Sequence, residues 1–160
     1  MSVRTDVQRA AEEDSTPDDA FIATWVTRAI EAAWDSGDSE VSVRIVDAAE
    51  IRVLNRDYRG KDNPTNVLSF PAGDVAGLPD DEPSPLGDIV VCASVVQDES
   101  AAQGKATPDH WAHMLVHGAL HLLGYDHESE EEAETMEALE IEILAAHGVG
   151  DPYKAAAKNC

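Results

Sequence analysis

The sequence predicts an α+β fold in which about five helices pack on a small mixed four-stranded sheet. Two observations support this class. Short apolar runs typical of strands occur within the first 92 residues, between segments with helical spacing, whereas the chain beyond them has helical periodicity. With 160 residues and a mass of 17.2 kDa, the chain is long enough to bury a hydrophobic core, and we expect one domain spanning residues 1–160.

The N-terminal segment predicts a strand followed by a helix. Apolar and polar residues alternate over 2–8, as they do in a half-exposed strand. Thr16 can cap a helix, Pro17 suits its first turn, and Gly37 provides a stop. The helical spacing between these residues depends on Phe21, Ile22, Trp25, Val26, Ala29, Ile30 and Ala33.

The next segment predicts a second strand and a second helix. Residues 41–46 alternate in a strand pattern rich in valine and isoleucine. Asp47 and Glu50 then form a capping pair for a helix over 48–58, and Gly60 lies where this helix should end.

Two further strands enclose a proline-rich loop. Residues 65–70 predict a short strand bounded by Pro71. Residues 71–85 hold four prolines and two glycines, which exclude a regular element, so this loop is either a flap beside a substrate or a plain surface loop. The near-continuous apolar run at 87–92 predicts a strand that is buried on both faces in the middle of the sheet.

The second half of the chain predicts three helices. The first covers about 94–103. The second covers 108–123, with Thr107 as its cap and Gly124 as its stop. The third covers about 130–146, and its apolar side should consist of Met136, Leu139, Ile143 and Leu144.

The charge distribution is strongly acidic, with one local exception. A formal net charge of −21 opposes general affinity for nucleic acid, because the protein repels a polyanion, so any such contact must be local. Four of the eleven basic residues lie between positions 52 and 61, and three of them share one side of the predicted helix. These cations either bind an anionic partner or only complement the helix dipole. The four are Arg52, Arg56, Arg59 and Lys61.

The sequence predicts a cytoplasmic protein without a membrane partner. No apolar run approaches the roughly 18 to 20 residues of a membrane-spanning helix. Residues 1–14 also lack the apolar core of a signal peptide. The two cysteines, Cys92 and Cys160, are expected to be free thiols.

Three histidines indicate a metal site. A helix places His117 and His121 on one face, and a reversal at Gly124 can bring His127 back toward them. Three imidazoles leave the fourth position of a tetrahedral ion open, as in catalytic sites, so we expect one Zn²⁺ ion per chain. Nitrogen ligands also suit nickel, copper or iron.

The histidine spacing is that of a zincin-like metal helix with one important difference. Residues 117–127 reproduce the H-x-x-x-H-x-x-G-x-x-H pattern of metzincin proteases. In those proteases the residue after the first histidine is a glutamate that serves as general base, and here it is Gly118. The substitution disfavours a peptidase of that mechanism.

Three further residues are candidates for supporting roles. His113 extends the helical stripe of the metal ligands and either assists them, contacts substrate or only packs. Asp126 lies between two ligands and could orient an imidazole or act on a proton. Lys61 ends the basic stripe and could contact substrate.

These features together resemble the YbeY family, the bacterial single-strand-specific endoribonucleases that act in rRNA maturation. The resemblance is carried by three blocks, at residues 55–71, 86–92 and 113–127, and extends to residues 136–140 and 151–153. The first and third blocks are highly specific. The first fifty residues match only in layout.

The resemblance implies a zinc site at His117, His121 and His127 and a functional arginine at Arg59. It also implies cleavage of single-stranded rRNA during maturation of the 16S rRNA 3′ end, a role in ribosome quality control and contact with the small ribosomal subunit. The net charge of −21 is an unexpected property for an enzyme that acts on RNA.

The residues themselves suggest a mechanism that fits this resemblance. Arg59 would hold the scissile phosphodiester in its planar fork while the metal polarises an oxygen, with water or the neighbouring 2′-hydroxyl as nucleophile. Two other functions stay open: a ribosome-binding maturation factor with a structural metal, and a metal-dependent hydrolase of another substrate. The sequence does not indicate an oligomeric state.

Overall fold

The structure is a computed structural model that describes residues 3–11, 16–34, 37–72 and 83–153. Within these ranges, four strands form one mixed sheet with the order β1-β2-β4-β3, and only β3 is antiparallel to its neighbour. With the five helices of the same ranges, this arrangement confirms the predicted α+β class. In chain order the elements are β1 (Val3–Arg9), α1 (Asp19–Ala33), β2 (Ser39–Val46), α2 (Ala48–Arg59), β3 (Val67–Pro71), β4 (Ser84–Cys92), α3 (Ala93–Gln103), α4 (Thr107–Leu122) and α5 (Glu130–Ala146).

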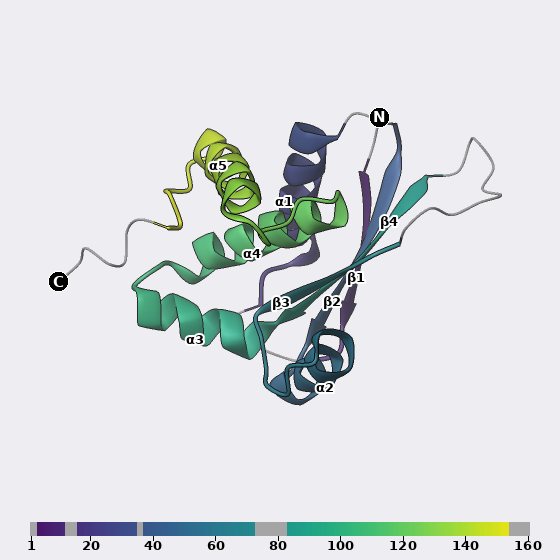
Figure 1. The fold of residues 1–160 in the computed structure, drawn as a ribbon, viewed down its shortest axis with the longest axis vertical. Helices are drawn as coiled ribbons and strands as arrows, with labels where there is room; N and C mark the ends of the chain where they lie inside the picture. The colour runs from purple at the N-terminus through teal and green to yellow at the C-terminus, as the bar shows by residue number, and fades with distance from the viewer. Residues whose placement is uncertain (1–2, 12–15, 35–36, 73–82, 154–160) are drawn as a thin grey trace.

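Helices cover both faces of the sheet, with α1 and α4 on one side and α2 on the other (Figure 1). Alternate residues of β4 divide between the two sides. Ile89 and Val91 pack with α1 and α4. Val90 and Cys92 face the opposite way and pack with Ile51 of α2. The position of β4 between β2 and β3 confirms the expectation of a central strand buried on both faces.

The start of α1 differs from the prediction. The helix begins at Asp19, and the Asp18 carboxylate accepts a hydrogen bond of 2.9 Å from the backbone N–H of Phe21. Asp18 therefore has the capping role that was expected of Thr16, because its acceptor atom reaches the free N–H groups of the first turn. Pro17 precedes the cap instead of opening the helix.

The start of α4 also differs. Thr107 is the first residue of the helix, and the cap position belongs to Ala106, which forms no side-chain capping bond. The Thr107 hydroxyl lies 3.0 Å from the Ser100 hydroxyl at the end of α3. It links two consecutive helices rather than capping one of them.

Three other element boundaries differ from the predicted ones. α1 ends at Ala33, before Gly37, because the next residue is already extended. Regular structure continues into both ends of the predicted loop, since β3 runs to Pro71 and β4 begins at Ser84. Residues 73–82, where a flap was considered, lie outside the described residues.

Two expectations about the environment of the chain can be compared with the structure. Among the helices of the described ranges, none has both the length and the apolar composition needed to cross a membrane. Cys92 is buried and free, as expected. Cys160 lies outside the described residues.

Candidate metal centre and the adjoining pocket

α4 and the turn that follows it bring the three candidate metal ligands together. His117 and His121 lie one helical turn apart with ring centres separated by 4.6 Å, and Gly124, at a φ of +100°, reverses the chain. The His127 ring then lies 5.1 Å from that of His121 and 5.7 Å from that of His117. One ring nitrogen from each residue lies within 4.8 Å of the others, so the three histidines could hold a metal ion.

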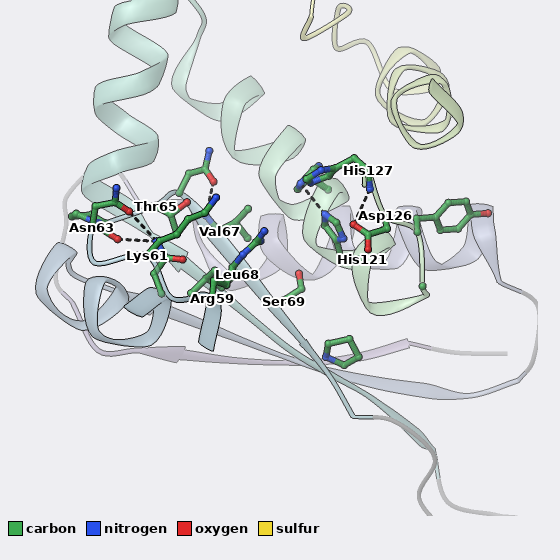
Figure 2. A pocket seen from close by; sticks show the side chains of 17 residues that line it. Arg59, Lys61, Asn63, Thr65, Val67, Leu68, Ser69, His121, Asp126 and His127 are labelled. Atoms are coloured by element: carbon green, nitrogen blue, oxygen red, sulfur yellow. Dashed lines mark hydrogen bonds between the residues drawn. The ribbon is translucent and has the colours of Figure 1, made fainter. Parts of the chain in front are cut away.

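The turn itself is held by Asp126. Its carboxylate accepts a hydrogen bond of 2.8 Å from the backbone N–H of His127, next to the ligand it could orient (Figure 2). His127 is exposed, and this bond restricts the backbone that carries it. Asp126 therefore contributes to the position of the third imidazole through the main chain.

A hydrogen bond at Nδ1 of His117 leaves its Nε2 free to face His121. Nδ1 of His117 lies 2.6 Å from a carboxylate oxygen of Glu140 in α5, so Nδ1 carries the proton. Nε2 then offers a lone pair, and it lies 3.2 Å from Nε2 of His121. Two imidazole nitrogens at this separation need a proton or a cation between them, which fits a metal ion.

The pKa of His121 is shifted in the direction that favours metal binding, because a neutral imidazole is the form that binds a metal. Burial, followed by the positive charge that His117 and His127 can carry, lowers the pKa of His121 to about 4. Burial alone would raise the pKa of Glu140, but its hydrogen bonds with His113 and His117 outweigh this effect and lower the pKa to about 2. At neutral pH the carboxylate is ionised, and the imidazole of His121 is neutral.

Glu140 is a candidate site residue that the sequence motifs do not indicate. The predicted apolar side of the last helix included Leu139, but Leu139 is only half-buried and Glu140 is fully buried. The available signal was the helical spacing, because Glu140 lies one turn from both Met136 and Leu144 on the apolar side of the helix. A carboxylate in that position requires partners.

Glu140 has two further polar partners, Tyr153 and His113. The Tyr153 hydroxyl donates a hydrogen bond to its second carboxylate oxygen. His113 is buried, with Nε2 3.1 Å from the Tyr153 hydroxyl and 3.5 Å from Glu140. His113 therefore lies in a buried polar network with Glu140, and the neighbouring His110 pairs with Glu99 at 2.9 Å instead.

A cavity of about 610 Å³ adjoins the three histidines and extends to the end of α2. Figure 2 shows Arg59 and Lys61 on one side of this cavity and His121, Asp126 and His127 on the other. The structure thus brings together the two sequence blocks that carry the candidate residues. His113 does not line this cavity.

The end of α2 determines which cations face the cavity. Gly60 has a left-handed conformation, with φ of +73°, and ends the helix as predicted. Arg52 is paired with Asp62 at 2.8 Å and is not available to a ligand. Arg59 and Lys61 form no ion pair or side-chain hydrogen bond with any residue that the structure describes.

The close packing around Gly118 leaves no room for a glutamate at the position after the first histidine. A Cβ atom at this position would lie 2.9 Å from Cγ2 of Ile89 and 3.4 Å from the Ser69 hydroxyl. The Gly118 carbonyl also accepts a hydrogen bond of 2.9 Å from Ser69. Position 118 packs directly on the sheet, so a side chain there would separate α4 from β3 and β4.

Known proteins resemble this chain along most of its length. A family model described as Endoribonuclease YbeY matches residues 6–148. A protein named Endoribonuclease YbeY from Alkalilimnicola ehrlichii is 57% identical over 139 residues, which cover 86% of this chain and 82% of that protein. One of the same name from Halorhodospira halophila is 59% identical over 140 residues, covering 88% and 90%.

A solved structure shares the fold. The solution structure of a Thermotoga maritima protein is 27% identical in sequence, with a TM-score of 0.55, and the match covers 95% of this chain and 99% of that one. Together with the family match over residues 6–148, these similarities confirm the resemblance first seen in the motifs. The chain belongs to the YbeY family of endoribonucleases.

Proposed function

We propose that this protein is a metal-dependent endoribonuclease that cleaves single-stranded RNA and acts in maturation of the 16S rRNA 3′ end and in ribosome quality control. The observation that carries the proposal is the shared cavity of about 610 Å³, in which three histidines face Arg59 and Lys61. Metal ligands beside cations that have no ionic partner among the described residues suit an anionic phosphodiester. The family match over residues 6–148 supports the same activity.

His117, His121 and His127 would hold one Zn²⁺ ion per chain. Three imidazole nitrogens that lie close together, with Nδ1 of His117 directed at the Glu140 carboxylate, fit this ion. When bound, zinc supplies Lewis-acid chemistry that stabilises negative charge on oxygen. Glu140 would be a positioning residue, because it acts through His117 and does not reach the cavity.

Arg59 would be the catalytic residue that binds the scissile phosphate. Its guanidinium can donate two parallel hydrogen bonds to phosphate oxygens and can stabilise the additional charge of the transition state. Lys61 adds a second positive charge on the same side of the cavity. Asp126 would hold the main chain of His127 in place.

The acidic net charge of −21 limits RNA contact to this region. The substrate would be single-stranded rRNA in the cytoplasm, presented on the small ribosomal subunit, and all these functions would reside in one domain. Binding of the ribosomal subunit would compensate for weak electrostatic attraction, because it raises the local concentration of the RNA end.

Arg59→Ala tests the proposal, with Arg56→Ala as the matched control. Arg56 belongs to the same basic stripe but is paired with Asp57 at 3.1 Å and does not line the cavity. Cleavage of a single-stranded RNA by zinc-loaded protein should fall about 100-fold or more in Arg59→Ala, with unchanged zinc content, and should stay near the native rate in Arg56→Ala.

Metal removal completes the test. His117→Ala and chelated native protein should both lose cleavage. Cleavage that survives both treatments would contradict the proposal and indicate a contaminating nuclease. Binding to ribosomal subunits without cleavage would instead favour a maturation factor with a structural metal.

A further inference from the structure

An exposed aromatic side chain lies beside the candidate phosphate-binding residue. Tyr58 precedes Arg59 at the end of α2, and 58% of its surface is exposed. Phe70 of β3 packs against the Tyr58 ring, with ring centres 4.4 Å apart and an angle of 66° between the planes. The side chain is therefore supported by the sheet while most of it faces solvent.

Tyr58 borders a hollow that continues the metal cavity past Arg59. This hollow has a volume of about 350 Å³. Its lining includes Tyr58 and Glu128, which do not line the larger cavity, together with six residues that do. The shared residues are Arg59, Leu68, Ser69, His121, Asp126 and His127. A ligand bound at Arg59 and the histidines could thus extend to Tyr58 without leaving a continuous surface.

The charges that line the hollow provide little attraction for RNA beyond the phosphate at Arg59, so a further contact with RNA there should be one that is not electrostatic. Asp126 and Glu128 line it, and Arg59 is its one basic lining residue among those that the structure describes. Beyond the phosphate bound at Arg59, an RNA backbone gains little attraction from the two carboxylates of this surface, whereas stacking of a base on an aromatic ring does not depend on net charge. Proteins that bind single-stranded nucleic acid combine these two contacts, a cation for the phosphate and a ring for the base.

We infer that Tyr58 is a stacking platform for one unpaired nucleobase of the RNA, next to the phosphate bound at Arg59. This inference rests on the proposed function and adds a base subsite to it. A base can reach the ring only after it has left a double helix. Tyr58 would therefore contribute to the preference for single-stranded substrate, and the contact would be tolerant of base identity, because every base has a flat face.

The test uses RNAs that lack one base at a time. A single-stranded RNA with one cleavage site is prepared in versions with an abasic nucleotide at each position flanking the site. With native zinc-loaded protein, one position next to the site should show a loss of about ten-fold or more in kcat/KM. The Tyr58→Phe variant should show the same loss of kcat/KM with the abasic RNA, because phenylalanine also stacks on a base. Tyr58→Leu should cut intact RNA more slowly and show no further loss with the abasic one.

Val53→Ala provides the control. Val53 is also exposed on α2, at 44%, but lines neither hollow, so its replacement should leave both the rate and the abasic effect unchanged. Thermal unfolding of each variant confirms that it is folded. A purely structural role of Tyr58 would lower stability without changing the sensitivity to a missing base.

The outcomes separate this inference from the proposed function. Absence of RNA cleavage by native zinc-loaded protein contradicts the proposed function. Cleavage with no sensitivity to an abasic nucleotide at any flanking position overturns the stacking role alone, even if Tyr58→Leu does not fold. An abasic effect of equal size in native protein and in folded Tyr58→Leu overturns it as well.

Discussion

The Glu140 carboxylate lies 2.6 Å from Nδ1 of His117, although the two residues are 23 positions apart and belong to different helices. The contact joins the interiors of α4 and α5. It determines which nitrogen of His117 carries the proton, and therefore which one can bind a metal. Tyr153 and His113 complete the partners of the buried carboxylate.

Glu140→Gln should weaken zinc binding by about ten-fold to a hundred-fold. Glutamine has the same shape but lacks the negative charge that holds the proton on His117. Zinc titration against a competing chelator measures the change. The control is Glu142→Gln, at an exposed position of the same helix, which should bind zinc as the native protein does. Native affinity in Glu140→Gln would show that the contact does not act on the metal site.

Gly118→Ala should lower the free energy of unfolding by about 1 to 3 kcal/mol, because the new methyl group overlaps Ile89 in a tightly packed interface. Denaturant unfolding of the metal-free protein measures this effect without a contribution from zinc. Gly150→Ala is the control, since a Cβ atom at Gly150 meets nothing within 4 Å. Equal stability of the two variants would mean that α4 can move away from the sheet at little cost.

Asp18→Ala should destabilise the protein by about 1 kcal/mol through the loss of the α1 cap, whereas Thr16→Ala should have little effect. The Thr16 hydroxyl is buried and has no hydrogen-bond partner among the described residues. Thermal and denaturant unfolding of both variants test the assignment. The reverse order of stabilities would restore Thr16 as the cap.

Glu99→Gln should make stability less dependent on pH in the acidic range. Burial alone would raise the pKa of Glu99, but hydrogen bonds from His110 and Asn66 outweigh it, so its pKa in the folded protein is lowered. The unfolded chain therefore binds the proton at higher pH than the folded chain does. The stabilisation is present above the unfolded pKa and is lost as pH falls through the lowered one.

Denaturant unfolding of metal-free protein between pH 7 and pH 3 measures this dependence. The slope at the acidic end should be shallower in Glu99→Gln than in the native protein. Asp98→Asn, at the exposed neighbouring position, serves as the control and should keep the native slope. An unchanged slope in Glu99→Gln would mean that other carboxylates account for the acid sensitivity.

Short-range patterns in the sequence determined most of the secondary structure. The helical spacing and Gly124 were sufficient to place His117 and His121 on one face and to bring His127 toward them. Such predictions succeed because helix periodicity, glycine conformation and strand alternation depend on neighbouring residues. At α1 several adjacent polar side chains could serve as the cap, and the backbone path selects Asp18. At α4 the helix begins one residue earlier than predicted, so the cap position falls on Ala106.

Contacts between distant segments were decided by the tertiary structure. The cavity between Arg59 and the histidines is lined by the end of α2, by β3 and by α4, and no local sequence pattern predicts how close these segments lie. Glu140 was not among the residues expected on the apolar side of the last helix, and its partner lies on another helix. The sequence by itself determined which residues are the candidates for binding a metal and a phosphate. Packing decided their orientation, because burial and long-range hydrogen bonds depend on the complete fold.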